Sequence, residues 1–235
     1  MRKMITKIYN FILAQFFPNL KAVFRYNNSH HKQKKWTKIA IKKYQKQGSY
    51  SWGKAIEDEK NLGNYVKVRD EILIPNCLNK AVLELGCLDG KWSQYIIPKA
   101  MHTTLVDLSE DIIPILENRM KNVNVNKKFT FYATKGYELD GVQDDTIDLI
   151  FSIDTLVRVK KRYLEKYFSE FRRVLKKDGK MILHLPCTAS KMSKHKKFVF
   201  LSPTNITNYM YSNSFKKFKL DFETINHGVL LLYGF

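Results

Sequence analysis

The feature that most constrains this chain is a glycine-containing turn that follows a short apolar strand. The stretch covers residues 81–93 and reads Ala-Val-Leu-Glu-Leu-Gly-Cys-Leu-Asp-Gly-Lys-Trp-Ser. Glycine tolerates positive φ and has no Cβ, so the backbone of such a turn can approach a nucleotide-like ligand closely. The stretch therefore predicts an α/β fold with a cofactor held at Gly86 to Gly90.

Two common glycine loops do not fit this turn. A dinucleotide fingerprint requires Gly-x-Gly-x-x-Gly, but Leu88 and Lys91 stand at the second and third glycine positions. A phosphate loop ends in Gly-Lys-Ser/Thr, but Trp92 follows Lys91. The remaining template is acid-x-Gly-x-Gly-x-Gly. Glu84 and the two glycines match it, and Leu88 replaces the middle glycine.

Further matches follow in order along the chain. Asp107 ends a second apolar strand about 20 residues beyond the turn, where a ribose-binding acid is expected in a βαβ unit. Residues 146–154 read as a fourth strand, and residues 171–183 read as a helix, a glycine turn and a fifth strand. With these motifs, residues 50–235 resemble the class I S-adenosylmethionine-dependent methyltransferases.

The resemblance implies a Rossmann-like, doubly wound, seven-stranded sheet with a terminal antiparallel strand. S-adenosyl-L-methionine is the implied cofactor, with Glu84 at its amino end, Asp107 on the ribose hydroxyls and Leu108 against the adenine. Lys135 stands where the family often has an acid for the adenine amino group. The implied cofactor-binding residues are Glu84, Leu85, Gly86, Cys87, Asp89, Gly90, Asp107, Leu108 and Ser152.

Two polar residues near strand ends are candidates for catalysis. Asp154 follows the fourth strand and His184 lies near the end of the fifth, at the sheet edge where α/β proteins place ligands. Either could position the acceptor or act as a general base. The alternatives are a helix N-cap for Asp154 and a hydrogen-bonded core histidine for His184.

Periodicity and turn residues predict alternating strands and helices. The expected strands cover residues 81–85, 102–107, 128–133, 147–153 and 180–186. The expected helices cover residues 62–74, 90–98, 110–121, 163–176 and 203–214. Residues 217–225 and 229–233, joined by Asn226-His227-Gly228, predict an antiparallel hairpin.

Residues 1–49 predict a basic, amphipathic helical extension ahead of the domain at residues 50–235. The formal net charge of the chain is +19, which raises the question of an anionic membrane or nucleic acid as partner. Apolar residues recur at helical spacing in residues 1–25, so this segment either packs on the domain or lies on an anionic membrane surface. The apolar run is too short to span a bilayer, and no signal-peptide cleavage site follows it.

The three cysteines, Cys77, Cys87 and Cys187, form neither a disulfide framework nor a zinc pattern. A cytoplasmic location is therefore expected, with a peripheral position at the inner face of the membrane as the alternative. No metal is expected, because His30 and His31 have no carboxylate or thiol nearby in the sequence.

Three functions remain open from the sequence. The first is methyl transfer to a small-molecule or glycan acceptor, with oxygen as the favoured acceptor atom. The second is RNA methylation, suggested by the charge, although nucleic acid is the less favoured partner because no separate RNA-binding module is visible. The third is a non-catalytic, cofactor-binding protein on a decayed methyltransferase fold, suggested by Leu88 and Lys135.

Overall fold

The computed structural model describes residues 37–48, 50, 56, 63–123, 125, 129–191 and 201–235. The apolar, basic segment at residues 1–25, with its two alternatives of packing on the domain or lying on a membrane, and the pair His30 and His31 lie outside these residues. Within the described part of the chain, no helix combines the length and the apolar character needed to cross a bilayer.

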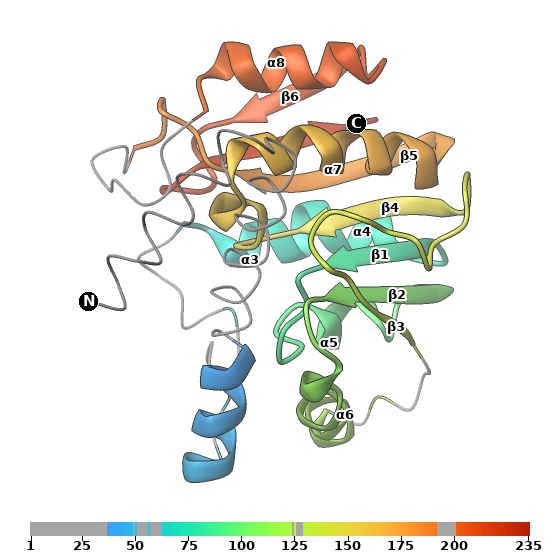
Figure 1. Ribbon diagram of the computed structural model, residues 1–235, viewed down its shortest axis with the longest axis vertical. Coiled ribbons are helices and arrows are strands. Elements are labelled where there is room, and N and C mark those ends of the chain that lie inside the picture. Colours follow the sequence, from blue (N-terminus) through green and yellow to red (C-terminus); the bar gives the residue numbers. More distant parts are fainter. Residues whose placement is uncertain are drawn as a thin grey trace, which may run out of the picture.

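The strands form one seven-stranded sheet in the order β3-β2-β1-β4-β5-β7-β6 (Figure 1). Strand β7 runs antiparallel to both of its neighbours, β5 and β6, and the other pairs are parallel. The order reverses between β1 and β4, which is where doubly wound sheets bind ligands. The strands are β1 (Ala81–Leu85), β2 (His102–Asp107), β3 (Thr130–Ala133), β4 (Ile147–Ser152), β5 (Leu175–Leu185), β6 (Phe218–Asp221) and β7 (Val229–Tyr233).

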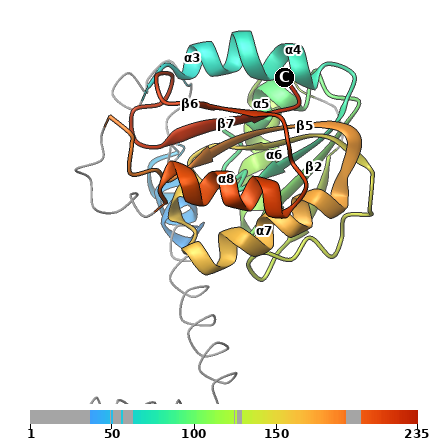
Figure 2. The same cartoon turned by 90° about the horizontal axis from the view of Figure 1, so that it is seen from above.

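Helices cover both faces of this sheet, with α3 and α4 on one side and α7 and α8 on the other (Figure 2). The regular helices are α3 (Tyr65–Lys67), α4 (Ile74–Cys77), α5 (Ser93–Ile96), α6 (Ile113–Asn122), α7 (Lys161–Val174) and α8 (Pro203–Ser212). A π-helical segment η2 (Val68–Leu73) joins α3 to α4, and the 3₁₀ turns are η3 (Glu110–Ile112) and η4 (Leu156–Arg158).

The sheet separates two apolar cores. Strand β1 is buried along its whole length, and its alternate residues enter different cores. Leu83 packs with the α7 side of the sheet, and Val82 packs with the α4 side. Helix α7 contributes Leu164, Phe168 and Phe171, whose spacing places them on one helical face. Burial on both faces explains why the central strands read as continuous apolar runs.

The structure has a strand or helix at each predicted position but moves several of their ends. The helix expected at residues 62–74 is composed of α3, η2 and α4, and residues 222–228, rather than Asn226-His227-Gly228 alone, join β6 to β7. The helix expected at residues 90–98 is only α5, because the turn through Gly90 delays its start. Strand β5 begins at Leu175, before the expected residue 180. The strand expected at 217–225 ends at Asp221, because that carboxylate accepts backbone hydrogen bonds from Glu223 and Thr224 and closes a turn.

A helix over residues 37–47 packs beside the start of α6. Ala40 and Tyr50 share an apolar cluster with Ile112 and Ile115. The Tyr50 hydroxyl also accepts a 3.0 Å hydrogen bond from the side chain of Asn122. These contacts fix the described end of the N-terminal extension against the edge of the sheet where the central strands end.

Candidate active site

A cleft opens at the carboxyl ends of β1, β2 and β4. Most of its wall comes from the segments that directly follow these strands, where parallel sheets present their ligand sites. Its lining includes six of the predicted cofactor-binding and catalytic residues in the turns: Gly86, Cys87, Asp89, Asp107, Leu108 and Asp154. Leu85, at the end of β1, also lines it.

Gly86 starts the turn after β1 in a conformation that favours glycine. Its φ is +81°, and its N–H donates a 2.7 Å hydrogen bond to the carbonyl of Val106 on the neighbouring strand. A Cβ at this position would lie 2.0 Å from the Thr155 hydroxyl oxygen. The turn therefore needs glycine both for its backbone conformation and for the close approach of the loop after β4.

Leu88, the departure from the glycine template, keeps the backbone geometry of the turn. Its φ is +43°, in the left-handed region where a glycine would be expected. Its side chain is half-buried against the cluster of Ala40, Ile112 and Ile115. Its N–H donates a 2.8 Å hydrogen bond to Asp107 Oδ2. Leucine at this position thus preserves the turn and adds an anchor for the N-terminal helix.

Asp107 is fixed at the end of β2 by two backbone donors. Leu88 N–H and Leu108 N–H bind one carboxylate oxygen each, at 2.8 and 2.6 Å. Burial raises the pKa of Asp107, and these two hydrogen bonds act in the opposite direction. Each carboxylate oxygen has two acceptor positions, so a free position on each remains for hydroxyl donors in the cleft.

Glu84, Gly90 and Ser152, predicted to bind the cofactor, are not among the residues that line the cleft. Glu84 is buried and accepts a 2.6 Å hydrogen bond from the Ser93 hydroxyl. Burial raises its pKa to about 8, although that hydrogen bond opposes the shift. Ser152 donates to the carbonyl of Leu85, and Gly90 packs against the side chains of α6. In this structure the three residues do not line the cleft, and their contacts support the turn.

Asp154 lies at the centre of a cluster of aromatic side chains from three other parts of the chain. Its Oδ1 is 3.1 Å from His184 Nδ1 and 2.9 Å from His227 Nε2. The Tyr65 hydroxyl from α3 donates to the same carboxylate, 2.7 Å from Oδ2. His184 is fully buried, whereas the Asp154 side chain is 32% exposed and faces the cleft.

Asp154 and His184, the two predicted catalytic residues, differ in how their surroundings affect the pKa and in their access to the cleft. Burial would raise the pKa of Asp154, but the neighbouring imidazoles of His184 and His227 outweigh it and hold the pKa well below its ordinary value. Such a carboxylate is a weak base, so its position favours orienting a neighbour or an acceptor. Burial lowers the pKa of His184, which does not line the cleft and therefore has no direct contact with a ligand there.

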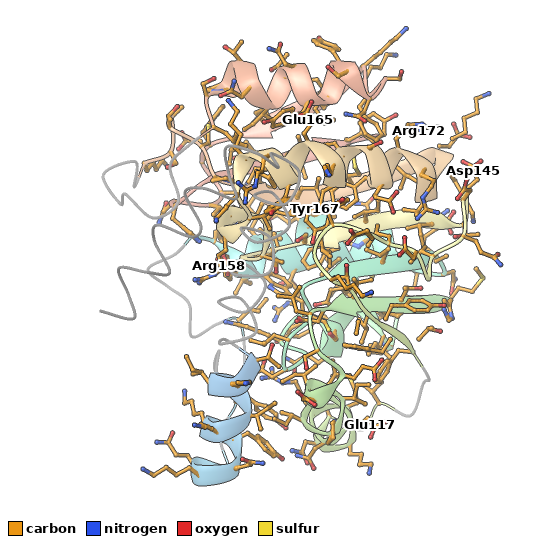
Figure 3. The ribbon with its side chains drawn as sticks, in the orientation of Figure 1. Glu117, Asp145, Arg158, Glu165, Tyr167 and Arg172 are labelled. Carbon is orange, nitrogen blue, oxygen red and sulfur yellow. The ribbon has the colours of Figure 1, made fainter. Side chains whose placement is uncertain are left out.

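Sequence patterns missed several residues of this wall. Thr155 and Arg158 follow Asp154, and Tyr167 comes from α7; all three line the cleft, and Figure 3 labels Arg158 and Tyr167. Thr37 lines it from the N-terminal helix. The predicted hairpin gave a usable signal for His227, since β7 pairs with β5 through Leu185↔Val229 and so brings the preceding turn beside the end of β5.

Lys135 does not line the cleft, whereas Cys87 lines it but is buried. Lys135 is exposed and lines a smaller cavity next to the cleft, together with Glu138 and Asp140. Cys87 is buried, and burial raises the pKa of its thiol well above the ordinary value. A protonated, buried thiol is a packing group, which agrees with the small side chain that the turn requires.

The fold itself has known counterparts. A solved structure described as a putative S-adenosylmethionine-dependent methyltransferase from Methanococcus maripaludis superposes with a TM-score of 0.55 at 16% identity, covering 75% of this chain and 88% of that one. At this identity the likeness concerns the fold, and it agrees with the sheet order and the single antiparallel strand.

The sequence comparisons identify the family of the central region. Residues 82–179 match the family model described as a methyltransferase domain. The ribosomal RNA small subunit methyltransferase A of Mesomycoplasma hyopneumoniae is 35% identical over 72 residues, which is 28% of each chain. Phosphoethanolamine N-methyltransferase 1 of Triticum aestivum is 27% identical over 123 residues, covering 51% of this chain and 24% of that protein.

Residues 82–179 thus match a methyltransferase domain, and the seven-stranded sheet that contains them has the Rossmann-like fold of the S-adenosylmethionine-dependent methyltransferase structure described above. The matched region covers about a quarter of the length of either curated relative described above.

Proposed function

We propose that this protein transfers a methyl group from S-adenosyl-L-methionine to an oxygen atom of a small-molecule or glycan acceptor. The observation that carries the proposal is one cleft lined by the glycine turn, by Asp107 and by Asp154. It joins a site suited to a nucleoside with a polar wall suited to an acceptor. Positioning two reactants in such a cleft can supply about 7–11 kcal/mol of a reaction barrier.

The residues on the cofactor side fit this ligand. The free acceptor positions of Asp107 suit the paired hydroxyls of a ribose, and Leu108 offers an apolar surface beside them. Gly86 lets the loop after β4 approach the glycine turn, since a Cβ there would meet Thr155. When bound, S-adenosyl-L-methionine supplies the electrophilic methyl group, and this chain holds and orients it.

The residues on the acceptor side favour a polar acceptor. Asp154 presents a half-buried carboxylate to the cleft, and Arg158 lies one turn further along the chain with its Nε–H 3.3 Å from the Asp154 carbonyl. A carboxylate can hold an acceptor hydroxyl by a charge-assisted hydrogen bond. Tyr167 and Val159 add apolar surface on the same wall, which would exclude water from the acceptor.

Asp107→Asn is expected to weaken binding of S-adenosylhomocysteine by about 10- to 100-fold, since hydrogen bonds to a charged group contribute about 1.5–3 kcal/mol. The amide nitrogen would replace one of the two carboxylate oxygens, so one of the two backbone N–H donors would lose its acceptor and face another donor. Isothermal titration calorimetry measures the change, with the exposed Asp178→Asn as control. Equal affinity in wild type and Asp107→Asn would remove Asp107 from the site.

The same titration tests whether the domain has a working cofactor site. Micromolar binding of S-adenosylhomocysteine by the wild-type protein, with no binding of a nicotinamide dinucleotide, is the result that the proposal requires. No binding of either ligand would end the proposal, and binding without methyl transfer to any acceptor would support the non-catalytic alternative.

RNA is a second candidate acceptor because of the net charge of +19 and the similarity to a ribosomal RNA methyltransferase. The acceptor class is tested by incubating the protein with methyl-labelled cofactor and fractionated cell extract. Label in a glycan, a lipid-linked sugar or a small molecule supports the proposal. Label in RNA alone, with binding that weakens steeply as salt is raised, would replace it with RNA methylation.

A further inference from the structure

Asp154, His184 and His227 direct three potential metal-ligating atoms toward one another. The two imidazole nitrogens lie 3.1 and 2.9 Å from the same carboxylate oxygen. All three potential ligand atoms lie within 4.8 Å of one another. In the described part of the chain, they form the cluster of three potential metal ligands from histidine, cysteine or acidic side chains. The two rings meet edge to face, with centroids 4.5 Å apart.

The hydrogen bonds around His184 are not mutually compatible. Its Nδ1 lies 3.3 Å from the Asp154 N–H, a donor, and 3.1 Å from Asp154 Oδ1, an acceptor. One ring nitrogen donates or accepts but cannot do both, so one contact is unfavourable in either tautomer. The other nitrogen, Nε2, is buried without a hydrogen-bond partner in the described part of the chain. A cation between Nδ1 and Oδ1 would make their approach favourable.

We propose that Asp154 Oδ1, His184 Nδ1 and His227 Nε2 bind a divalent transition-metal ion. Two imidazoles with one carboxylate are a ligand set that suits Zn²⁺, Fe²⁺, Co²⁺ or Ni²⁺ better than Mg²⁺ or Ca²⁺. Ligand bonds of about 2.1 Å at right angles separate neighbouring ligand atoms by about 3 Å. The two oxygen-to-nitrogen distances already have that length, so these pairs need little movement to become neighbouring ligands.

The surroundings hold the three ligands in place. The Tyr65 hydroxyl binds the Asp154 carboxylate at 2.9 Å from Oδ1 and 2.7 Å from Oδ2. Second partners of this kind orient metal ligands in proteins. A Cβ on Gly228 would lie 2.5 Å from His184 Nε2, so the turn before β7 packs directly on that ring. The expectation of no metal was drawn from close sequence neighbours, whereas these ligands lie 30 or more positions apart along the chain.

The ion would have open positions on the side of Asp154, which lines the cleft. An acceptor hydroxyl bound there would lose its proton more easily, because a bound cation lowers the pKa of an oxygen ligand. This role rests on the proposed function, whereas metal binding itself does not.

The test is a calorimetric and spectroscopic titration of the chelator-treated, full-length protein with Co²⁺ and Zn²⁺. The expected result is saturation at one equivalent, visible Co²⁺ absorption bands, and a rise in melting temperature with metal concentration. His227→Gln and Asp154→Asn should abolish all three signals. Tyr65→Phe, which removes only the orienting hydroxyl, should weaken binding by about 10- to 100-fold.

Two controls and a second ligand make the outcome decisive. His102→Gln changes an exposed histidine outside the cluster. A double replacement of His30 and His31 by glutamine removes two histidines that are adjacent to each other in the sequence. Both variants should bind metal as the wild type does. Absence of metal uptake by the wild type, or uptake unchanged by His227→Gln and Asp154→Asn, would overturn the proposal. Calorimetry with S-adenosylhomocysteine on the same samples reports the proposed function separately, since either ligand can bind without the other.

Discussion

Gly86→Ala is expected to abolish measurable binding of S-adenosylhomocysteine and to lower the free energy of unfolding by about 3 kcal/mol or more. Two effects combine. The new side chain must adopt a φ of +81°, which costs about 1–2 kcal/mol for a residue with a Cβ. That Cβ would also lie 2.0 Å from Thr155 Oγ1 and 2.6 Å from Thr155 Cβ, and overpacking of this kind costs about 1–3 kcal/mol.

The collision cannot be relieved by a change of rotamer. Because the Cβ of Thr155 is itself too close, the backbone after β4 must move, and that backbone carries Asp154 and lines the cleft. Urea denaturation measures the stability, and calorimetry measures ligand binding. Gly48→Ala is the matched control, since Gly48 has a φ of +59° but no atom within 4 Å of the place that an alanine methyl would take. It should show the backbone cost alone.

A double variant separates the two effects at Gly86. Gly86→Ala combined with Thr155→Gly removes the collision and keeps the unfavourable φ, so it should recover part of the lost stability. If Gly86→Ala alone is as stable as Gly48→Ala and still binds the ligand, the close approach of the two loops is wrong.

Glu84→Gln is expected to stabilise the ligand-free protein by about 3–5 kcal/mol near pH 8.5 and to have little effect near pH 4, using about 1.4 kcal/mol per pKa unit. The cause is the raised pKa of Glu84, about 8 in the folded protein against 4.5 for an ordinary glutamate side chain. Burial is the main contribution, and the negative charge of Asp107 adds to it. Glutamine has the same shape, carries no charge and can still accept the hydrogen bond from Ser93.

The sign follows from proton binding. Between pH 4.5 and about 8 the folded protein keeps a proton on Glu84 that the unfolded chain releases, so the stability of the wild type falls as the pH rises through this range. Above pH 8 the full cost of a buried carboxylate is present. Urea denaturation at a series of pH values measures this difference, with the exposed Glu71→Gln as control. Parallel pH profiles for wild type and Glu84→Gln would show that Glu84 is not held in its neutral form.

Local patterns were sufficient to predict most of the strands and helices and several of the residues that line the cleft. The apolar runs and the glycine turn gave β1 with its following loop, and the acid that ends β2 was found by its spacing from that loop. These features depend on residues close together in the chain, where backbone conformation and side-chain period carry the information. Leu88 was the uncertain position, and its positive φ shows that the local backbone, rather than the residue type, defines the turn.

The part of the cleft wall around Asp154 was less predictable because it is assembled across the sheet. Asp154 and His184 were identified at strand ends, but neither Tyr65 nor His227 has a local pattern that marks it as a partner of Asp154. Their meeting depends on the insertion of β7 beside β5 and on the packing of α3 over the same end of the sheet. The predicted hairpin placed His227 beside a strand end, but the pairing of β7 with β5 is a long-range contact that sequence spacing alone does not specify.

The order of residues was enough to specify the fold class, the succession of strands and helices, the glycine turn and the acid at the end of β2, because each depends on residues within a few turns of chain. Which of the predicted residues face the cleft was a matter of tertiary packing. Packing placed Glu84 and Ser152 behind the turn and brought Asp154 together with two histidines, because burial and contact depend on how the strands and helices meet.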